Sequence, residues 1–253
     1  FVMEKTLIIT DVTRMKSPRV CIAGITDNGE TLRPTLPHPG IQENWLYSEN
    51  KAVIRPFARV IFNFIKQESQ KPHTEDWQID TVYKWHPDLL NITERKTLLL
   101  GIAEKYLNDL FHAPLQQIGQ GYFIPKGEGQ RSLATLAPKQ VNFIGLCEEY
   151  GEMRYRIKFT DWSGTNYMLT VTDLSFRYFV EYLRIVRKLS CHEINCRLEQ
   201  LVSNAEIFLR LGLARGFNPD KQGSQDRCYL QVTGIYTFPD YLQLKCFADY
   251  SQQ

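Results

Sequence analysis

The residues best suited to binding chemistry lie near the end of the chain, in a segment that reads as a β-strand. Arg227, Tyr229 and Gln231 fall on one face of this strand, because strand side chains alternate with a period of two. Leu230 and Val232 fall on the opposite face. A cation, an aromatic ring and an amide suit phosphate contacts, base stacking and hydrogen bonds to base edges. This polar face predicts contact with nucleic acid, although Tyr229 also suits packing over the end of a barrel.

A second strand pattern carries a ladder of cations. Arg154, Arg156 and Lys158 share one face, and at roughly 3.3 Å per residue they span about 13 Å, a length that can follow a phosphate backbone. The alternative is a solvated strand face whose charges are neutralised across a hairpin by nearby carboxylates. Those carboxylates are Glu148, Glu149 and Glu152. Both interpretations stay open at this point.

Two further arginines lie in the strand that precedes the polar loop before Cys228. Arg210 and Arg215 have opposite parity, so they share a face only if a bulge intervenes, for which Gly212 is a suitable place. We include both arginines among the candidate nucleic-acid contacts.

Composition limits the classes of function. Lys and Arg number 30 against 28 Asp and Glu, for a formal net charge of +2, so affinity for phosphate must come from local clustering. No apolar run approaches the roughly 18 residues of a membrane helix, and the first residues lack a signal-peptide pattern. We therefore expect a cytoplasmic protein with no membrane partner.

Motifs for catalysis or cofactor binding are missing from the sequence. Cys191, His192 and Cys196 cluster, but no second pair with zinc-ligand spacing accompanies them. No glycine-rich loop ends in Gly-Lys-Ser/Thr, and no Gly-x-Ser-x-Gly elbow occurs. We expect no metal, no cofactor and no enzymatic activity. A nucleic-acid-processing hydrolase is a less favoured alternative, since distant carboxylates can converge in a folded barrel.

The remaining pattern alternates strands with helices. Asp27–Gly29 predicts a hairpin turn, and the proline-rich segment 32–40 predicts a loop that is excluded from the centre of a sheet. Leucines at helical spacing predict a helix from Thr93 to Phe111. Further helices are expected over Asp173–Lys188 and His192–Val202, and a last strand over 242–246.

This order predicts a mainly β protein with helices, of the α+β class, built as two OB-like β-barrels joined by a helix. The first barrel would span residues 3–92, the connecting helix residues 93–118, and the second barrel, with inserted helices, residues 119–250.

The whole chain resembles the dual OB-fold domain family of bacterial defence and conflict systems. The resemblance rests on Val20–Ile25, Leu32–Pro34, Pro72–Trp77, Val171–Leu174, Leu211–Arg215 and Gln231–Tyr241. It implies nucleic-acid binding beside other effector proteins, with Arg210, Arg215, Tyr229 and Gln231 as contacts and with no catalytic residue.

Two hypotheses from different classes follow. The leading one is a nucleic-acid-binding module that acts as an accessory subunit in antiviral defence, with RNA or DNA, single or double stranded, as the ligand. The alternative is a non-catalytic scaffold of a defence complex, which holds a protein partner by strand addition or through the aromatic helix Asp173–Lys188. Near-neutral net charge favours the scaffold, and the cation ladder favours nucleic acid.

Overall fold

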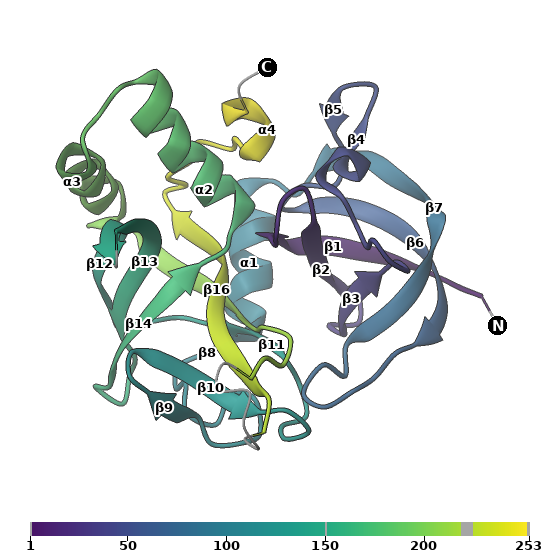
Figure 1. The fold of residues 1–253 in the computed structure, drawn as a ribbon. Helices are drawn as coiled ribbons and strands as arrows, with labels where there is room; N and C mark the ends of the chain where they lie inside the picture. Colours follow the sequence, from purple (N-terminus) through teal and green to yellow (C-terminus); the bar gives the residue numbers. More distant parts are fainter. Residues whose placement is uncertain (1, 150, 219–224, 252–253) are drawn as a thin grey trace.

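The computed structural model describes residues 2–149, 151–218 and 225–251 and places them in two β-rich units that lie side by side (Figure 1). The first unit comprises β1 (Met3–Arg14), β2 (Val20–Thr26), β3 (Thr31–Thr35), the 3-10 helix η1 (Glu43–Leu46), β4 (Tyr47–Ser48), β5 (Lys51–Ala52), β6 (Ala58–Gln67) and β7 (Asp76–Leu89). The helix α1 (Ile92–Ile102) follows.

The second unit comprises β8 (Ala103–Glu104), β9 (Gln116–Ile118), β10 (Gly121–Pro125), β11 (Leu133–Leu136), β12 (Gln140–Glu149), β13 (Glu152–Thr160), β14 (Asn166–Val171), the helix α2 (Leu174–Glu181), the π-helical turn η2 (Tyr182–Val186), α3 (Cys191–Val202), β15 (Glu206–Leu213) and β16 (Arg227–Phe238). A short C-terminal helix, α4 (Phe247–Tyr250), ends the described chain.

The first unit is a closed barrel with the strand order β1-β2-β3-β7-β6. Its β3 and β7 run parallel, and the other neighbouring strands run antiparallel. Val60, Phe62 and Phe64 alternate along β6 and are fully buried, because a closed barrel turns every second side chain into its core.

The proline-rich segment is not excluded from the sheet, which corrects the prediction made for it. Residues Thr31–Thr35 form β3, between β2 and β7. The backbone N–H of Arg33 donates to the carbonyl of Glu75, the residue just before β7. The nitrogen of the next residue, Pro34, therefore points to the opposite side of the strand, toward β2. The ladder with β2 has ended by then at Leu32, and the missing N–H of Pro34 therefore breaks no hydrogen bond.

The second unit is a nine-stranded sheet whose main path runs β12-β13-β14-β16-β15-β11-β8, with the β9–β10 hairpin beside β16. Here β14–β16 and β11–β8 are parallel pairs, and β15 pairs antiparallel with β16 and β11. Within the described residues, backbone pairing closes one barrel, and the second predicted barrel is an open sheet by this criterion.

The helix predicted over Thr93–Phe111 ends at Ile102. It starts earlier than predicted, because the side chain of Asn91 accepts from the backbone of Glu94 and the side chain of Glu94 accepts from Asn91 in a capping box. Leu107, Leu110 and Phe111 are buried in the core of the second unit without being helical. These residues have helical spacing in the sequence, but in the structure a compact turn buries them.

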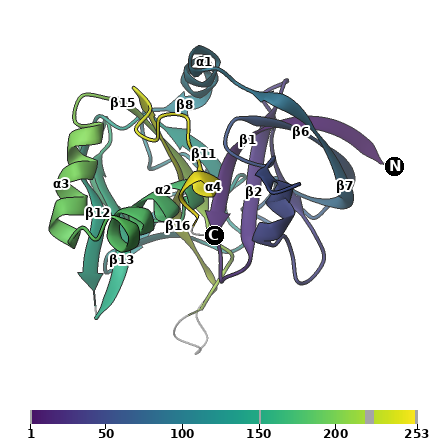
Figure 2. The same cartoon turned by 90° about the horizontal axis from the view of Figure 1, so that it is seen from above.

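The last predicted strand, over 242–246, is also wrong. The Asp240 carboxylate accepts from the backbone N–H groups of Leu242 and Leu244, and Gln243 and Leu244 have positive φ angles. These features make a turn, which carries the chain to α4. Phe247 of α4 is buried in the core of the first unit, so the C-terminal segment returns to the barrel (Figure 2).

Backbone hydrogen bonds and a shared apolar cluster join the two units. The N–H of Arg14 at the end of β1 donates to the carbonyl of Thr172 after β14, at 2.8 Å. At the seam near α1, Phe57 and Leu90 pack with Leu99 and Phe208. No helix among the described residues has the length and apolar composition needed to cross a membrane.

Candidate nucleic-acid interface

The predicted cation ladder and the polar face of β16 belong to one face of the second sheet. Arg156 of β13 lies opposite Thr170 of β14, which in turn lies opposite Gln231 of β16. The Arg156 guanidinium donates to the Thr170 hydroxyl at 2.6 Å. Since directly paired residues point to the same side of a sheet, this row connects the two predicted groups across β14.

Two of the three cations in the ladder form ion pairs with carboxylates of the same chain. Arg156 donates through Nε and Nη2 to the two carboxylate oxygens of Glu149, at 2.9 and 2.5 Å. Arg154 pairs with Glu152 at 2.5 Å. Among the described residues, exposed Lys158 makes no ion pair, so it is the member of the ladder that is best placed to meet a phosphate.

Tyr229 and Arg227 are half-buried against the β9–β10 hairpin. The Tyr229 ring lies 5.7 Å from that of Phe123, and the Arg227 guanidinium lies 5.4 Å from the same ring. A Cβ on Gly121 would approach the Tyr229 ring to 3.0 Å, so the hairpin packs closely on it. Packing therefore occupies a large part of Tyr229, as its alternative interpretation proposed.

Arg210 is a structural residue, which corrects its prediction as a ligand contact. It is 1% exposed and forms an ion pair with Asp11 of β1, with Nε and Nη2 both 2.9 Å from Oδ2. The Thr233 hydroxyl donates to the other oxygen of Asp11, at 2.5 Å. A side chain so deeply buried between the units cannot reach a ligand at the surface.

Arg215 lies beyond the end of β15, and its side chain is half-exposed. It forms an ion pair through Nη1 with Oδ2 of Asp76, the first residue of β7. The bulge expected near Gly212 is not found in β15: at the register shift between Arg210 and Leu211 the extra residue belongs to β16, which leaves the alternation along β15 unchanged. Arg210 and Arg215 have different environments, one buried and one at the mouth of a cavity.

That cavity, which we term the cleft, lies between the two units and has a volume of about 260 Å³. The first unit lines it with Asp11, Thr13, Arg14, Met15, Lys16, Cys21, Ala23 and Arg33. The second unit lines it with Leu133, Thr172, Gly212, Leu213, Ala214, Arg215, Gln231 and Thr233.

A smaller cavity of about 150 Å³, which we term the recess, adjoins the cleft along β2 and β3. The two cavities share Met15, Cys21, Arg33 and Arg215 in their linings. Arg19 adds a further cation on the side of the recess. The acidic residue in these linings is Asp11, whose charge is already compensated by Arg210.

The cations around the cleft differ in how they are paired. Arg14 pairs with Glu43 at 2.6 Å, and Arg33 and Arg215 share Asp76. Lys16 is exposed and Arg19 is half-exposed, and neither side chain has a hydrogen bond or an ion pair within the part of the chain that the structure describes. Lys16 and Arg19 thus leave uncompensated positive charge at the rim.

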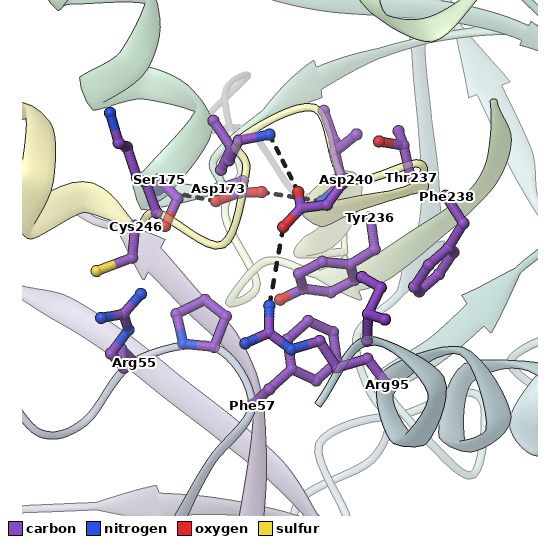
Figure 3. A pocket seen from close by; sticks show the side chains of 15 residues that line it. Arg55, Phe57, Arg95, Asp173, Ser175, Tyr236, Thr237, Phe238, Asp240 and Cys246 are labelled. Atoms are coloured by element: carbon purple, nitrogen blue, oxygen red, sulfur yellow. Dashed lines mark hydrogen bonds and ion pairs between the residues drawn. The ribbon is translucent and has the colours of Figure 1, made fainter. Parts of the chain in front are cut away.

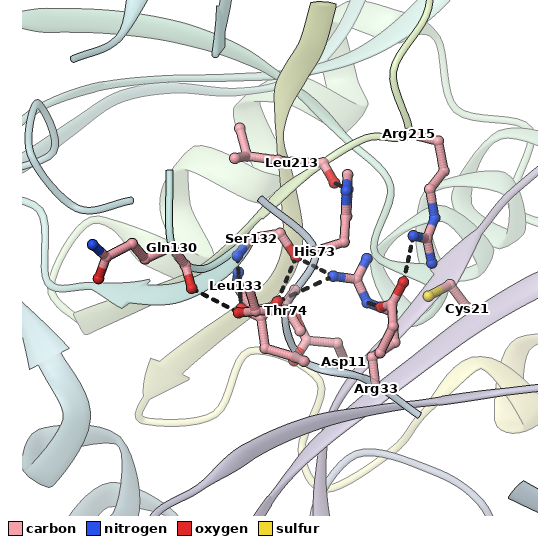
Figure 4. A network of polar contacts seen from close by, with 12 residues as sticks. Asp11, Cys21, Arg33, His73, Thr74, Gln130, Ser132, Leu133, Leu213 and Arg215 are labelled. Atoms are coloured by element: carbon pink, nitrogen blue, oxygen red, sulfur yellow. Dashed lines mark hydrogen bonds and ion pairs between the residues drawn. The ribbon is translucent and has the colours of Figure 1, made fainter. Parts of the chain in front are cut away.

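A buried polar network fixes the floor of the cleft (Figure 4). Arg33 is 5% exposed, has its Nε 3.1 Å from Oδ1 of Asp76, and donates through Nη2 to the Ser132 hydroxyl. The Glu75 carboxylate accepts from the backbone N–H groups of Ser132 and Leu133, at 2.6 and 3.0 Å. Residues of the first unit thereby hold the start of β11 in the second unit.

His73 completes this network next to Arg215 (Figure 4). Its Nε2 lies 3.0 Å from the Leu213 carbonyl, and the residue is 4% exposed. Burial, together with the positive charges of Arg33 and Arg215, lowers the pKa of His73 to about 4. The imidazole is therefore neutral at pH 7, and its Nε2–H donates a hydrogen bond to the Leu213 carbonyl.

Sequence reasoning missed Arg14, Lys16, Arg19 and Arg33. A signal was present, because three of these cations fall within Arg14–Arg19, which connects β1 to β2 beside Ser17-Pro18. The loop between the first two strands of an OB barrel is one of the loops that bind oligonucleotides, and cations there can meet phosphates. Arg33 was hidden in the segment that had been assigned to a loop.

A separate cavity between α1 and the end of β16 is too small for a ligand (Figure 3). Its volume is about 20 Å³, which accommodates about one water molecule. Arg95 lines this cavity, and its guanidinium lies 4.8 Å from the centre of the Phe57 ring and 3.8 Å from the Asp240 carboxylate. This site is part of the packing between the units.

The cysteine–histidine cluster predicted from sequence lies on α3. His192 Nε2 is 3.7 Å from Cys196 Sγ. Across the described residues, no group of three or more His, Cys, Asp and Glu side chains has an arrangement that could hold a metal ion. Metal independence stays a prediction.

The closed barrel, the mostly β composition and the strand order are those of an OB-type fold. A family model for the dual OB-containing domain matches residues 5–235. The chain therefore belongs to the dual OB-containing domain family. The comparison with curated proteins finds no match.

Proposed function

We propose that this protein is a nucleic-acid-binding module that uses the cleft and the adjoining face of β13, β14 and β16 as its binding surface. OB-fold domains commonly bind nucleic acids or mediate interactions, which makes this class the first to consider. The observation that carries the proposal is the set of cations drawn from both units around one concavity, with Lys16 and Arg19 uncompensated at its rim.

We further infer that both units are OB barrels. The order β12-β13-β14-β16-β15 repeats the order β1-β2-β3-β7-β6, and each order contains one parallel pair, β14–β16 or β3–β7. In addition, β11 pairs with β15 and leads through residues 137–139 into β12. We infer that β11 and β12 together form the first strand of this barrel, interrupted at Pro138. This strand pairs with β15 through β11 and with β13 through β12, and it thereby completes the barrel.

The test is fluorescence anisotropy with labelled RNA and DNA, single-stranded and duplex, over a range of salt concentrations. Because cations that neutralise phosphates release counterions, log affinity should fall with log salt, by about 0.7 per contact for single strands. Lys158→Ala should weaken binding and make the slope shallower by up to one contact. Absence of binding to any of these ligands at low salt would remove the proposal.

Lys51→Ala is the matched control for Lys158→Ala, because it removes the same charge elsewhere. Lys51 is exposed on β5, in the two-stranded β4–β5 sheet, outside the cleft lining and the β13 face. It should leave affinity and slope almost unchanged.

We also propose that the protein associates with other proteins of a bacterial defence system, on the basis of the family resemblance alone. The scaffold alternative loses one of its supports, since Phe176 and Phe179 of α2 are buried and do not offer an aromatic docking face. Exposed Ile185 and Val186 in η2 leave a small apolar patch for a partner. We propose a binding role without catalysis.

A further inference from the structure

We propose that the ligand of the cleft is a single strand of nucleic acid, whose backbone passes Arg19, Lys16 and Arg215 and whose unpaired base enters the space between the two units. This inference rests on the proposed function and specifies its ligand. It assigns the site to the seam between the units, so that neither unit alone holds the strand.

The depth of the cleft excludes a duplex from most of its surface. Thr172 and Thr233 are 7% and 8% exposed, and Arg33 on the floor is 5% exposed. A duplex keeps its bases paired inside and presents phosphates on a convex surface, so that it would meet the rim alone. An unpaired base can turn outward and enter a concavity, which is the usual mode of single-strand recognition.

The size of the cleft fits a small planar group. Its volume of about 260 Å³ lies just below the range for pockets that hold drug-sized molecules, about 300–1,000 Å³. The recess continues it by about 150 Å³ in the direction of β3. Together the cavities offer a path for a chain, with a side pocket for a base.

The walls combine apolar surface with free hydrogen-bonding groups. Ala23, Leu133 and Leu213 supply apolar surface from both units. The Gln231 amide has no hydrogen-bond partner among the described residues, and it lines the cleft from β16. Arg14 Nη1 is also buried without a partner, although its Nη2 donates to Tyr178 and pairs with Glu43.

A buried nitrogen such as Arg14 Nη1 is costly to leave without a hydrogen-bond partner, whereas the half-buried Gln231 amide is open to a ligand. Gln231 and Arg14 both line the cleft, and their polar groups can hydrogen-bond to the edge of a base, which carries both donors and acceptors. The cleft thus presents recognition groups inside and cations outside, in the arrangement that a single strand requires.

Arg215 lies where the two cavities meet, because it lines both of them. Its side chain is half-exposed and is held by Asp76 through Nη1. A phosphate that passes between the cavities would meet the solvent-facing part of this guanidinium. Lys16 and Arg19 lie before and after the Ser17-Pro18 turn, and their charges continue the phosphate path along the rim.

The test compares a labelled 12-nucleotide single strand with its duplex, as RNA and as DNA, in the anisotropy assay. We expect the wild type to bind the single strand at least about 10-fold more tightly than the duplex. The double variant Lys16→Ala/Arg19→Ala should bind the single strand about 10-fold more weakly and lower the salt slope by about 1.4, twice the value for one contact. Gln231→Ala should weaken binding without changing the slope.

Lys51→Ala/Arg197→Ala is the matched double control. Both side chains are exposed, lie on β5 and α3 outside both cavities, and make no side-chain bond within the described part of the chain. The control should retain wild-type affinity.

Two results would overturn the inference while the proposed function stands. One is equal binding of duplex and single strand by the wild type. The other is a Lys16→Ala/Arg19→Ala variant that behaves like the control although the wild type binds. No binding by the wild type at low salt would remove the inference and the proposed function together.

Discussion

The buried pair between Arg210 and Asp11 joins the two units at the level of single residues. Their side chains are 2% and 3% exposed, and Thr10 and Thr233 donate further hydrogen bonds to the Asp11 carboxylate. Removing one partner of such a pair leaves an uncompensated charge in the interior, which is more damaging than removing both.

We therefore expect Arg210→Met to lower the free energy of unfolding by about 3–5 kcal/mol. The double variant Asp11→Asn/Arg210→Met should lose less, because no carboxylate is left without its guanidinium. Urea unfolding monitored by circular dichroism measures both values. A double variant that is less stable than Arg210→Met would show that the charge of Asp11 is tolerated without Arg210.

His73 makes the stability of the fold depend on pH. Its pKa is lowered to about 4 by burial and by Arg33 and Arg215, whereas an unfolded histidine has a pKa near 6.5. Above pH 6.5 the imidazole is neutral in both states. Between pH 6.5 and pH 4 the unfolded state binds the proton first, so the contribution of His73 to stability is lost as pH falls, by about 3 kcal/mol in total.

The measurement is the free energy of unfolding of the wild type and of His73→Gln from pH 7.5 to pH 4. Glutamine keeps a neutral donor for the Leu213 carbonyl but does not titrate. The wild type should lose more stability than the variant over this range. Parallel curves would mean that folded His73 accepts a proton as readily as an unfolded histidine.

The face of the strand on which each side chain lies was the most predictable part of the candidate site. Alternation placed Gln231 and Tyr229 on one face and Arg154, Arg156 and Lys158 on another, and the paired row through Thr170 shows how these faces join. The burial of Arg210 was not predictable from parity, because its partner Asp11 lies 199 residues away in the chain. Local sequence carries no information about such a pairing.

At the scale of elements, α3 is fastened to the edge strand β12 through one side chain. Asn195 donates to the Leu146 carbonyl at 2.9 Å and accepts from the Leu146 N–H at 2.8 Å. This pairing satisfies the N–H and the carbonyl of Leu146 on the edge strand β12. Asn195 also lies against Gly145, where a Cβ would be 2.0 Å from Asn195 Oδ1.

We expect Gly145→Ala to lower the free energy of unfolding by about 1–3 kcal/mol, because the methyl group displaces Asn195 and leaves Leu146 unpaired. Gly101→Ala is the control, since Gly101 is exposed in α1 and a Cβ there meets nothing within 4 Å. It should be neutral or stabilising, by about 0.5–1 kcal/mol. Thermal unfolding of both variants gives the comparison, and equal stability of the two would contradict the role of Asn195.

Several elements were predictable because their pattern is local. The alternation of Val60, Phe62 and Phe64 gives β6, and the Asp27–Gly29 turn connects β2 to β3. The errors arose where tertiary contacts replaced local preference. Leu107 and Leu110 have helical spacing but are buried by a turn, and Pro34 is accepted in β3 because its neighbouring ladder has already ended.

At the scale of the whole molecule, the cleft exists because two units pack against each other. Arg33 comes from β3, whereas Gln231 and Thr233 come from β16, and the Glu75–Ser132 contact fixes the units at this point. The sequence predicted two units and a polar strand face. It could not predict which surfaces would meet, since that depends on contacts between distant segments such as the bond from Arg14 to Thr172.

Cross-linking of a bound strand tests most directly the claim that nucleic acid binds at this seam. A photoreactive base in a single-stranded oligonucleotide is irradiated with the wild-type protein at low salt, and the linked peptides are mapped by mass spectrometry. The account predicts links to both units, in the β1–β2 connection around residues 15–19 and in β16 around residues 229–233. Links that map to one unit only and lie outside these segments would contradict this account, as would the absence of any link.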